Sequence, residues 1–142
     1  MLKALNYLHE VVKLVHRDIK PNNIMIRRSH EATLVDFGIE AIMEGSNLRI
    51  DTLMYFAPEL LRQKKKNRAP FSAQTDIWAL GATFFYLLTG KYPFGSQKSL
   101  TKLAEAIRHT IINFKVITNE KARACIQRML DKNPETRITI ED

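Results

Sequence analysis

The chain has 142 residues, of which 45% are hydrophobic and 26% charged, a balance that excludes a disordered or fibrous protein. Its single cysteine, Cys125, excludes an internal disulfide framework, and with no signal-like start we expect a cytoplasmic or nuclear location. The net charge of +7 raises nucleic-acid binding as a function, but the basic run at residues 62–68 lacks interleaved aromatic side chains. We therefore expect a solvated basic loop and no nucleic-acid partner.

The first part of the chain predicts a helix, a small hairpin and a loop. Apolar residues between positions 2 and 12 recur near helical spacing. Segments 23–27 and 33–35 are short and rich in β-branched residues, and the polar RRSHE between them predicts a hairpin. Residues 38–55 keep no period and predict a loop. The apolar positions of the first helix are Leu2, Leu5, Leu8 and Val12.

The next helices are predicted at residues 58–63 and 73–88. Ser72 can cap the second of these, and Gly90 can end it in the left-handed conformation. This helix is apolar on every face beyond Asp76, which predicts a place at the centre of the domain. Its apolar run, residues 77–88, is too short to cross a bilayer, so we expect no membrane partner.

Two amphipathic helices complete the predicted fold. Apolar residues from Leu100 to Ile111 mark the first, and those from Ala122 to Leu130 mark the second, which begins at Thr118 or Asn119. No internal repeat or linker divides the chain. We expect one mainly helical (α+β) domain over residues 1–142, a helical bundle around a buried central helix with a small β-hairpin beside the functional site.

Polar residues crowd into the short segment HRDIKPNN, residues 16–23, and Asp36 follows the predicted hairpin. Asn23 begins one strand and Asp36 follows the other, so strand pairing brings an amide and a carboxylate together. Their hard oxygens suit Mg²⁺, which takes few protein ligands and completes its shell with water and phosphate. Asp18 is free to accept a proton from a hydroxyl, and Lys20 can contact a phosphate. This set predicts phosphoryl transfer.

These motifs resemble the catalytic domain of protein kinases. HRDIKPNN, DFG (residues 36–38) and APE (residues 57–59) stand in the order that kinases require, and the ordered set is far more specific than any one triplet. The resemblance covers nearly the whole chain as the C-terminal lobe of a Ser/Thr kinase. Further segments carry it: TLMYFAPE from Thr52, TDIWALG from Thr75, LLTGKYPF from Leu88 and LDKNPETRIT from Leu130.

The resemblance implies ATP and Mg²⁺ as cofactors and protein Ser/Thr hydroxyls as substrates. It implies that Asp18 is the catalytic base and that Lys20, a Ser/Thr-kinase feature, contacts the transferred phosphate. Thr52 would bridge these two side chains with its hydroxyl. Asn23 and Asp36 would hold the metal, and Met25 would lie against the adenine ring.

The resemblance also implies structural and regulatory roles. Asp76 would accept backbone N–H groups of the loop that holds His16 and Arg17, and Glu59 would form an ion pair with Arg137. His16 would pack against Phe37. Arginine before the catalytic aspartate often pairs with a phosphate on the activation segment, and Ser46 is the candidate for that phosphate.

The sequence contains no glycine-rich phosphate loop, strand lysine or partner glutamate. The resemblance assigns these parts to an N-terminal lobe, so we expect a fragment that needs this missing lobe as a partner and is inactive alone. A second departure is Asp51-Thr52-Leu53, where many kinases have Gly-Thr-Pro. The alternative function is a kinase-like scaffold that binds partners without catalysis; a scaffold has no chemical need to retain all of Asp18, Lys20, Asn23 and Asp36.

Overall fold

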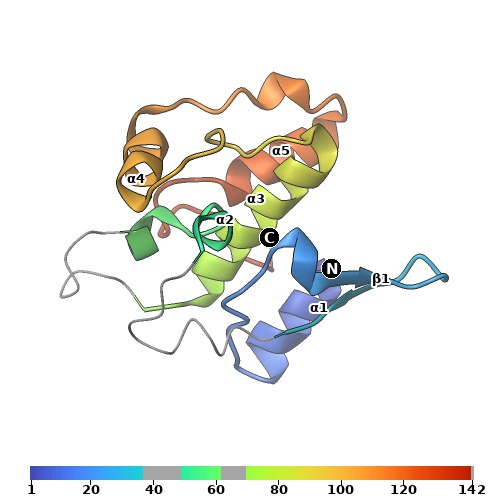
Figure 1. The fold of residues 1–142 in the computed structure, drawn as a ribbon. Coiled ribbons are helices and arrows are strands. Elements are labelled where there is room, and N and C mark those ends of the chain that lie inside the picture. The colour runs from blue at the N-terminus through green and yellow to red at the C-terminus, as the bar shows by residue number, and fades with distance from the viewer. Residues whose placement is uncertain (37–48, 62–69, 142) are drawn as a thin grey trace.

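The structure is a computed structural model that describes residues 1–36, 49–61 and 70–141. Phe37 and Ser46, for which roles were predicted, lie outside the described residues. Helix α3 runs through the middle of the molecule, with α4 and α5 on one side and α1 and the hairpin on the other (Figure 1). The elements in chain order are α1 (Leu2–Asn6), η1 (Tyr7–Val11), η2 (Pro21–Asn23), β1 (Ile24–Ile26), β2 (Ala32–Leu34), α2 (Ile50–Leu53), η4 (Pro58–Leu61), α3 (Ala73–Thr89), α4 (Leu100–His109), η6 (Phe114–Val116) and α5 (Glu120–Met129).

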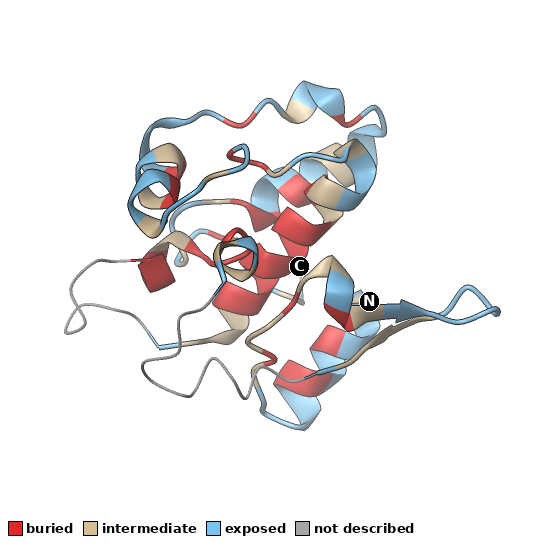
Figure 2. Ribbon diagram, viewed as in Figure 1, coloured by how far each residue is buried: buried red, intermediate tan, exposed pale blue. Residues whose placement is uncertain are grey.

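The predicted central helix is present as α3. The Ser72 hydroxyl accepts from the Thr75 backbone N–H while the Thr75 hydroxyl accepts from that of Ser72, so both helix-end donors are satisfied. Gly90 ends the helix with φ 69° and ψ 11°. Most of α3 is buried (Figure 2), although Leu87 and Leu88 near its end are more than half exposed. No helix in the described ranges is long and apolar enough to cross a membrane.

Helix α5 packs closely on α3 because α3 has a glycine at the crossing. A Cβ atom placed on Gly81 would lie 2.7 Å from Cβ of Met129 and 3.2 Å from Cγ of Leu130. Real Cβ atoms do not approach so closely, so only glycine permits this separation of the two helices. Trp78 is also fully buried, and it stacks on Phe94 with ring centroids 5.9 Å apart.

The first helix changes its hydrogen-bond pattern after one turn. Beyond α1, η1 is a π-helix, in which the Val12 N–H donates to the Tyr7 carbonyl at 3.1 Å. Leu5 and Leu8 are buried, as predicted, but Leu2 and Val12 are 44% and 43% exposed. The four apolar positions thus divide into a buried pair in the middle of the segment and an exposed pair at its ends.

The predicted hairpin is present, with strand boundaries that differ by about one residue. β1 pairs antiparallel with β2, and Ile24 lies opposite Leu34. The ladder extends one step further because the Val35 N–H donates to the Asn23 carbonyl at 3.0 Å. Asn23 itself belongs to the 3-10 helix η2, so the chain enters the hairpin directly from the polar segment.

Two other predicted elements need correction, and a third is confirmed. The predicted loop at residues 38–55 contains the short helix α2, which at four residues is too brief to show a period. The short helix predicted at residues 58–63 is present as the 3-10 helix η4, and residues 62 and 63 lie outside the described ranges. The helix from Leu100 ends at His109, because Thr110 has an extended backbone (φ −81°, ψ 133°), and Ile111 is 92% exposed instead of lying on the buried face.

Helix α5 begins where one of the two predicted caps stands. The Asn119 side chain accepts from the Ala122 N–H at 2.9 Å, so Asn119 and not Thr118 is the cap. Cys125 on this helix is half-buried, and its sulfur lies 4.0 Å from that of Met129.

Candidate active site

A single buried carboxylate fixes the loop that precedes the candidate catalytic residues. Asp76 in the first turn of α3 is 1% exposed and accepts from the backbone N–H groups of His16 at 2.7 Å and Arg17 at 2.9 Å. These are the contacts that the resemblance implied. Arg17 has a φ of 74°, an unfavourable conformation for a side chain with a Cβ, so the Asp76 contact holds strained backbone in place.

A third donor to Asp76 was missed by the sequence reasoning. His9 in η1 lies with Nε2 2.8 Å from Asp76 Oδ2, and both side chains are buried. Position 9 is four residues after Leu5 and seven after Leu2, so helical spacing puts it on the apolar face. The sequence gave no sign of the partner carboxylate, which lies 67 residues away.

The candidate catalytic side chains gather around one oxygen of Asp18. The Asn23 amide Nδ2 donates to Asp18 Oδ2 at 2.7 Å and to the Asp18 carbonyl at 2.7 Å. Lys20 Nζ lies 3.1 Å from the same Oδ2, and both charged side chains remain about one-fifth exposed. Oδ2 is therefore engaged by two donors, while the carboxylate stays within reach of solvent.

Thr52 joins this cluster through Lys20. Lys20 Nζ donates to Thr52 Oγ1 at 3.1 Å, so the ammonium lies between the hydroxyl and the Asp18 carboxylate. The resemblance implied that the Thr52 hydroxyl bridges Asp18 and Lys20. In the structure the Lys20 ammonium instead bridges Thr52 and Asp18. The long lysine side chain reaches both oxygens, which connects the first segment of the site to α2.

The hairpin places Asn23 and Asp36 at one end of the sheet. Because Val35 pairs with Asn23, Asp36 is the next residue along, where the chain leaves the sheet with a φ of 55°. The Asn23 amide nitrogen is committed to Asp18, which leaves its carbonyl oxygen as the group suited to a cation. An amide oxygen and an exposed carboxylate are the kinds of oxygen donor that fit Mg²⁺. Met25 on β1 is 60% exposed, so its thioether is accessible for contact with a flat ring.

A buried ion pair ties the segment after Thr52 to the end of the chain. Arg137 donates to Glu59 at 2.8 Å and 3.1 Å in a bidentate pair. The guanidinium also donates to the carbonyls of Asp131 at 2.9 Å and Gln74 at 2.7 Å, and lies 5.1 Å from the Trp78 ring. The predicted pair is thus present, with further partners that sequence did not indicate.

Three tyrosines adjoin the same segment. The Tyr92 ring lies 5.8 Å from that of Tyr55 and 5.0 Å from that of Tyr86, measured between centroids. Burial, followed by the neighbouring Tyr92, raises the pKa of Tyr55 above its ordinary value. The cluster links the end of α2 to the turn after α3, and no sequence motif predicted it.

Comparison with known proteins identifies the family. The model of the protein kinase domain matches residues 1–142. The chain belongs to the protein kinase family. It is 34% identical to the human Serine/threonine-protein kinase Nek10 over 143 residues, which is 96% of this chain and 12% of that protein. Two further relatives are 33% identical: Aurora kinase of Eremothecium gossypii (100% of this chain, 38% of the relative) and Serine/threonine-protein kinase cds1 of Schizosaccharomyces pombe (98% and 32%).

This kinase chain therefore spans well under half the length of the relatives that it matches. Within it, direct contacts join Asp18, Lys20, Asn23 and Thr52, and Asp36 follows Val35, whose N–H donates to the Asn23 carbonyl. The predicted packing of His16 on Phe37 and the role of Ser46 fall on residues outside the described ranges.

Proposed function

We propose that the chain is the C-terminal lobe of a Ser/Thr protein kinase, which transfers the γ-phosphate of ATP to Ser/Thr hydroxyls of protein substrates. One observation carries the proposal: Asp18 Oδ2 is held by Asn23 at 2.7 Å and by Lys20 at 3.1 Å, with Thr52 on the far side of the lysine. A scaffold has no need for a carboxylate held in this way beside a hydroxyl and a cation.

Each side chain has a role that its contacts support. Asn23 and Lys20 fix one carboxylate oxygen of Asp18, so the other oxygen would accept the proton of the substrate hydroxyl. Lys20 would also follow the charge of the transferred phosphate, since a flexible ammonium acts as a mobile point charge. The Thr52 hydroxyl would position Lys20 from the side of the substrate segment.

Asn23 and Asp36 would hold Mg²⁺, which when bound supplies positive charge to the phosphate oxygens of ATP. The hairpin would contribute the spacing, because the Val35 N–H pairs with the Asn23 carbonyl and Asp36 is the next residue. Met25 would contact the adenine from the same hairpin. Glu59 and Arg137 would anchor the substrate segment, and Asp76 would keep the loop before Asp18 in its strained shape.

Regulation by phosphate is part of the proposal. The half-buried Arg17 has its Nε atom buried, with no partner among the described residues. A phosphate on Ser46 would suit such a guanidinium through charge-assisted hydrogen bonds. In an active chain, Ser46→Ala should then lower activity and Ser46→Asp should restore part of it; equal activity of Ser46→Ala and the unaltered chain would exclude this switch.

The experiment that tests the proposal measures phosphate incorporation into a general Ser/Thr protein substrate with Mg²⁺ and labelled ATP. The assay uses the longest natural chain that contains these residues, with Asp18→Asn beside the control Glu135→Gln, which removes an exposed carboxylate elsewhere. We expect Asp18→Asn to lower kcat by at least about 10²-fold, the usual contribution of a general base. Equal rates for the two variants would refute the role of Asp18.

The alternative of a scaffold gives a different result in the same assay. A scaffold would show no phosphate incorporation in any chain length, and its partner binding would not depend on Asp18. For residues 1–142 alone we expect no measurable turnover, because they contain no glycine-rich phosphate loop or strand lysine. Robust turnover by these 142 residues, abolished by Asp18→Asn, would contradict that expectation.

A further inference from the structure

The surface around the end of α4 and the loop that follows it carries much of the chain's positive charge. Residues 100–132 contain seven Lys or Arg against three Asp or Glu, so this segment contributes +4 to the net charge of +7. It lies on the other side of α3 from the hairpin, at α4, α5 and the loop between them (Figure 1). The proposed kinase function uses none of these residues.

The loop after α4 presents Ile111 to solvent. This side chain is 92% exposed, whereas its neighbour Ile112 is buried in the core. The backbone beside it is held in place, because Lys132 Nζ donates to the Thr110 carbonyl at 3.1 Å and to the Arg108 carbonyl at 3.5 Å. Single exposed apolar side chains are common on proteins, so exposure alone assigns no role. The fixed backbone and the charges around Ile111 distinguish this position.

Three cations flank Ile111. Arg108 in the last turn of α4 and Lys115 in η6 are exposed, and Lys132 reaches the loop from beyond α5. Lys132 uses two of its three N–H donors on the loop carbonyls, which leaves one donor and the full charge for a partner. The Lys115 backbone is also held, because its N–H donates to the Asn113 side chain at 3.1 Å. We call Arg108, Ile111, Lys115 and Lys132 the α4-end patch.

The carboxylates of the segment neutralise little of the α4-end patch. Glu120 pairs with Arg123 at 3.6 Å, outside the patch. Asp131 accepts from a backbone N–H at 3.0 Å and from a hydroxyl at 2.8 Å. Glu105, one turn before Arg108, offsets one of the three cations. The patch therefore keeps a net positive charge that is complementary to carboxylates on a partner.

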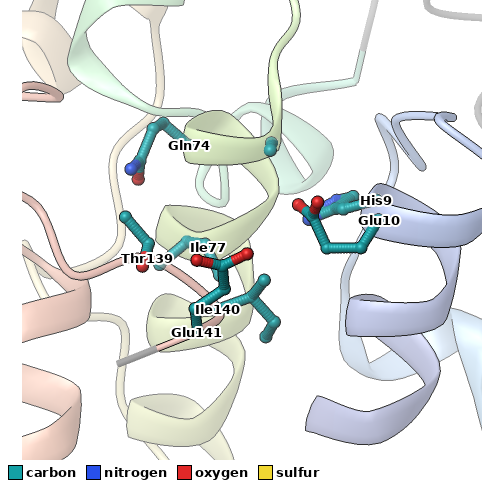
Figure 3. A pocket seen from close by; sticks show the side chains of 8 residues that line it. His9, Glu10, Gln74, Ile77, Thr139, Ile140 and Glu141 are labelled. Atoms are coloured by element: carbon teal, nitrogen blue, oxygen red, sulfur yellow. The ribbon is translucent and has the colours of Figure 1, made fainter.

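The shape and composition of the patch favour a protein partner. Small ligands bind in hollows, and the pocket of about 220 Å³ between η1, α3 and residues 139–141 shares none of its lining residues with the patch (Figure 3). Nucleic acid is disfavoured because no patch residue is aromatic, and nearby Phe114 packs against Phe85 with ring centroids 6.3 Å apart. A lipid surface is disfavoured because one isoleucine gives far less apolar area than the apolar face of a membrane-binding helix.

We propose that the α4-end patch binds an acidic segment of a partner protein, in which an apolar side chain contacts Ile111 and carboxylates contact the three cations. Covering Ile111 removes apolar surface from water, and the carboxylates form the ion pairs that orient the segment. This interaction does not depend on the Asp18 cluster, so a binding assay can fail while the kinase proposal stands, and the reverse also holds.

Fluorescence anisotropy with a labelled peptide, one leucine between two pairs of glutamates, tests the proposal on the longest natural chain that contains these residues. One control peptide has asparagine in place of the leucine, and another has glutamines in place of the glutamates. None of the three has a Ser/Thr hydroxyl, so none is a kinase substrate. We expect saturable binding of the acidic peptide and roughly tenfold weaker binding of each control, as for one apolar side chain or several exposed ion pairs. Equal binding of either control, or no saturable binding below about 1 mM peptide, would overturn the proposal.

Variants at exposed side chains locate the contact without disturbing the core. Ile111→Ser should weaken binding of the acidic peptide by roughly tenfold, whereas Val11→Ser, at a side chain of 64% exposure on η1, should leave it unchanged. Arg108→Gln should weaken binding two- to fivefold, as for an exposed ion pair. Arg28→Gln removes the same charge from the hairpin turn and should have no effect. Equal effects within either pair of variants would refute the assigned patch.

Competition separates an acidic protein segment from other anionic partners. Vesicles that contain phosphatidylserine and a single-stranded oligonucleotide are each titrated against the bound peptide. We expect the unlabelled acidic peptide to displace the labelled one at a lower concentration than either competitor. Stronger displacement by the vesicles or by the oligonucleotide would overturn the assignment to a protein segment.

Discussion

Loss of Arg137 should destabilise the fold far more than loss of the charge on its partner. Arg137→Met leaves both oxygens of the buried Glu59 carboxylate without their guanidinium, and it removes the donor to two backbone carbonyls. Breaking a buried pair costs about 3–5 kcal/mol, so we expect a loss near the upper end. In Glu59→Gln, Arg137 keeps its two carbonyls, the Trp78 ring and an amide oxygen, so the loss should be about 1–2 kcal/mol.

Urea unfolding followed by fluorescence measures this difference. Trp78 is the only tryptophan and lies against Arg137, so its emission reports directly on the site. With a slope of about 1–3 kcal/mol per molar urea, a gap of about 3 kcal/mol separates the two midpoints by at least about 1 M. Arg108→Met, at an exposed arginine, is the control. Equal losses for Arg137→Met and Glu59→Gln would refute the reasoning.

Three further predictions concern packing and ionisation. Gly81→Ala should lower the free energy of unfolding by about 1–2 kcal/mol, because overpacking against Met129 exceeds the gain in helix propensity; unchanged stability in urea would contradict the close crossing. The Asn133 N–H and then the Thr136 hydroxyl lower the pKa of Asp131. The ionised carboxylate therefore stabilises the fold above the ordinary carboxyl pKa, and this stabilisation is lost as pH falls through the lowered pKa. Thr136→Val should therefore raise the pKa of Asp131 in an NMR titration. The variant should be less stable than the unaltered chain at neutral pH and equally stable in acid, where Asp131 is protonated. An unchanged pKa would exclude the hydroxyl as a cause. The raised pKa of Tyr55 predicts that one of four tyrosines stays protonated beyond the ordinary value of about 10 in an absorbance titration, and that Tyr55→Phe removes this late step while Tyr7→Phe does not.

The sequence predicted those features that follow from short-range rules. Ser72 and Gly90 marked both ends of the central helix because capping chemistry acts within one turn. The hairpin followed from residue type and the polar connection, and it correctly brought Asn23 next to the chain segment that contains Asp36.

The sequence could not predict features that depend on distant partners or on irregular backbone. The π-helix after one turn was not foreseen, and neither was the carboxylate 67 residues away that His9 contacts. The extended backbone at Thr110 exposed Ile111 because the chain leaves the helix before its apolar pattern ends. In the candidate site, the motifs identified Asp18, Lys20 and Thr52. The sequence did not show that Lys20 lies between the other two, because that depends on the conformation of its long side chain.

Because Asp76 makes three hydrogen bonds, the conformation of the loop before Asp18 depends on the first turn of α3. His16 and Arg17 belong to no strand of the described ranges, and both amides donate to Asp76, so opening the first turn of α3 would break these two bonds together. Their amide protons should exchange with solvent at the pace of α3 and not at the pace of a surface loop. A mutation that destabilises the hydrophobic core around α3 would therefore also loosen the segment before Asp18, even where the mutated residue makes no contact with that segment.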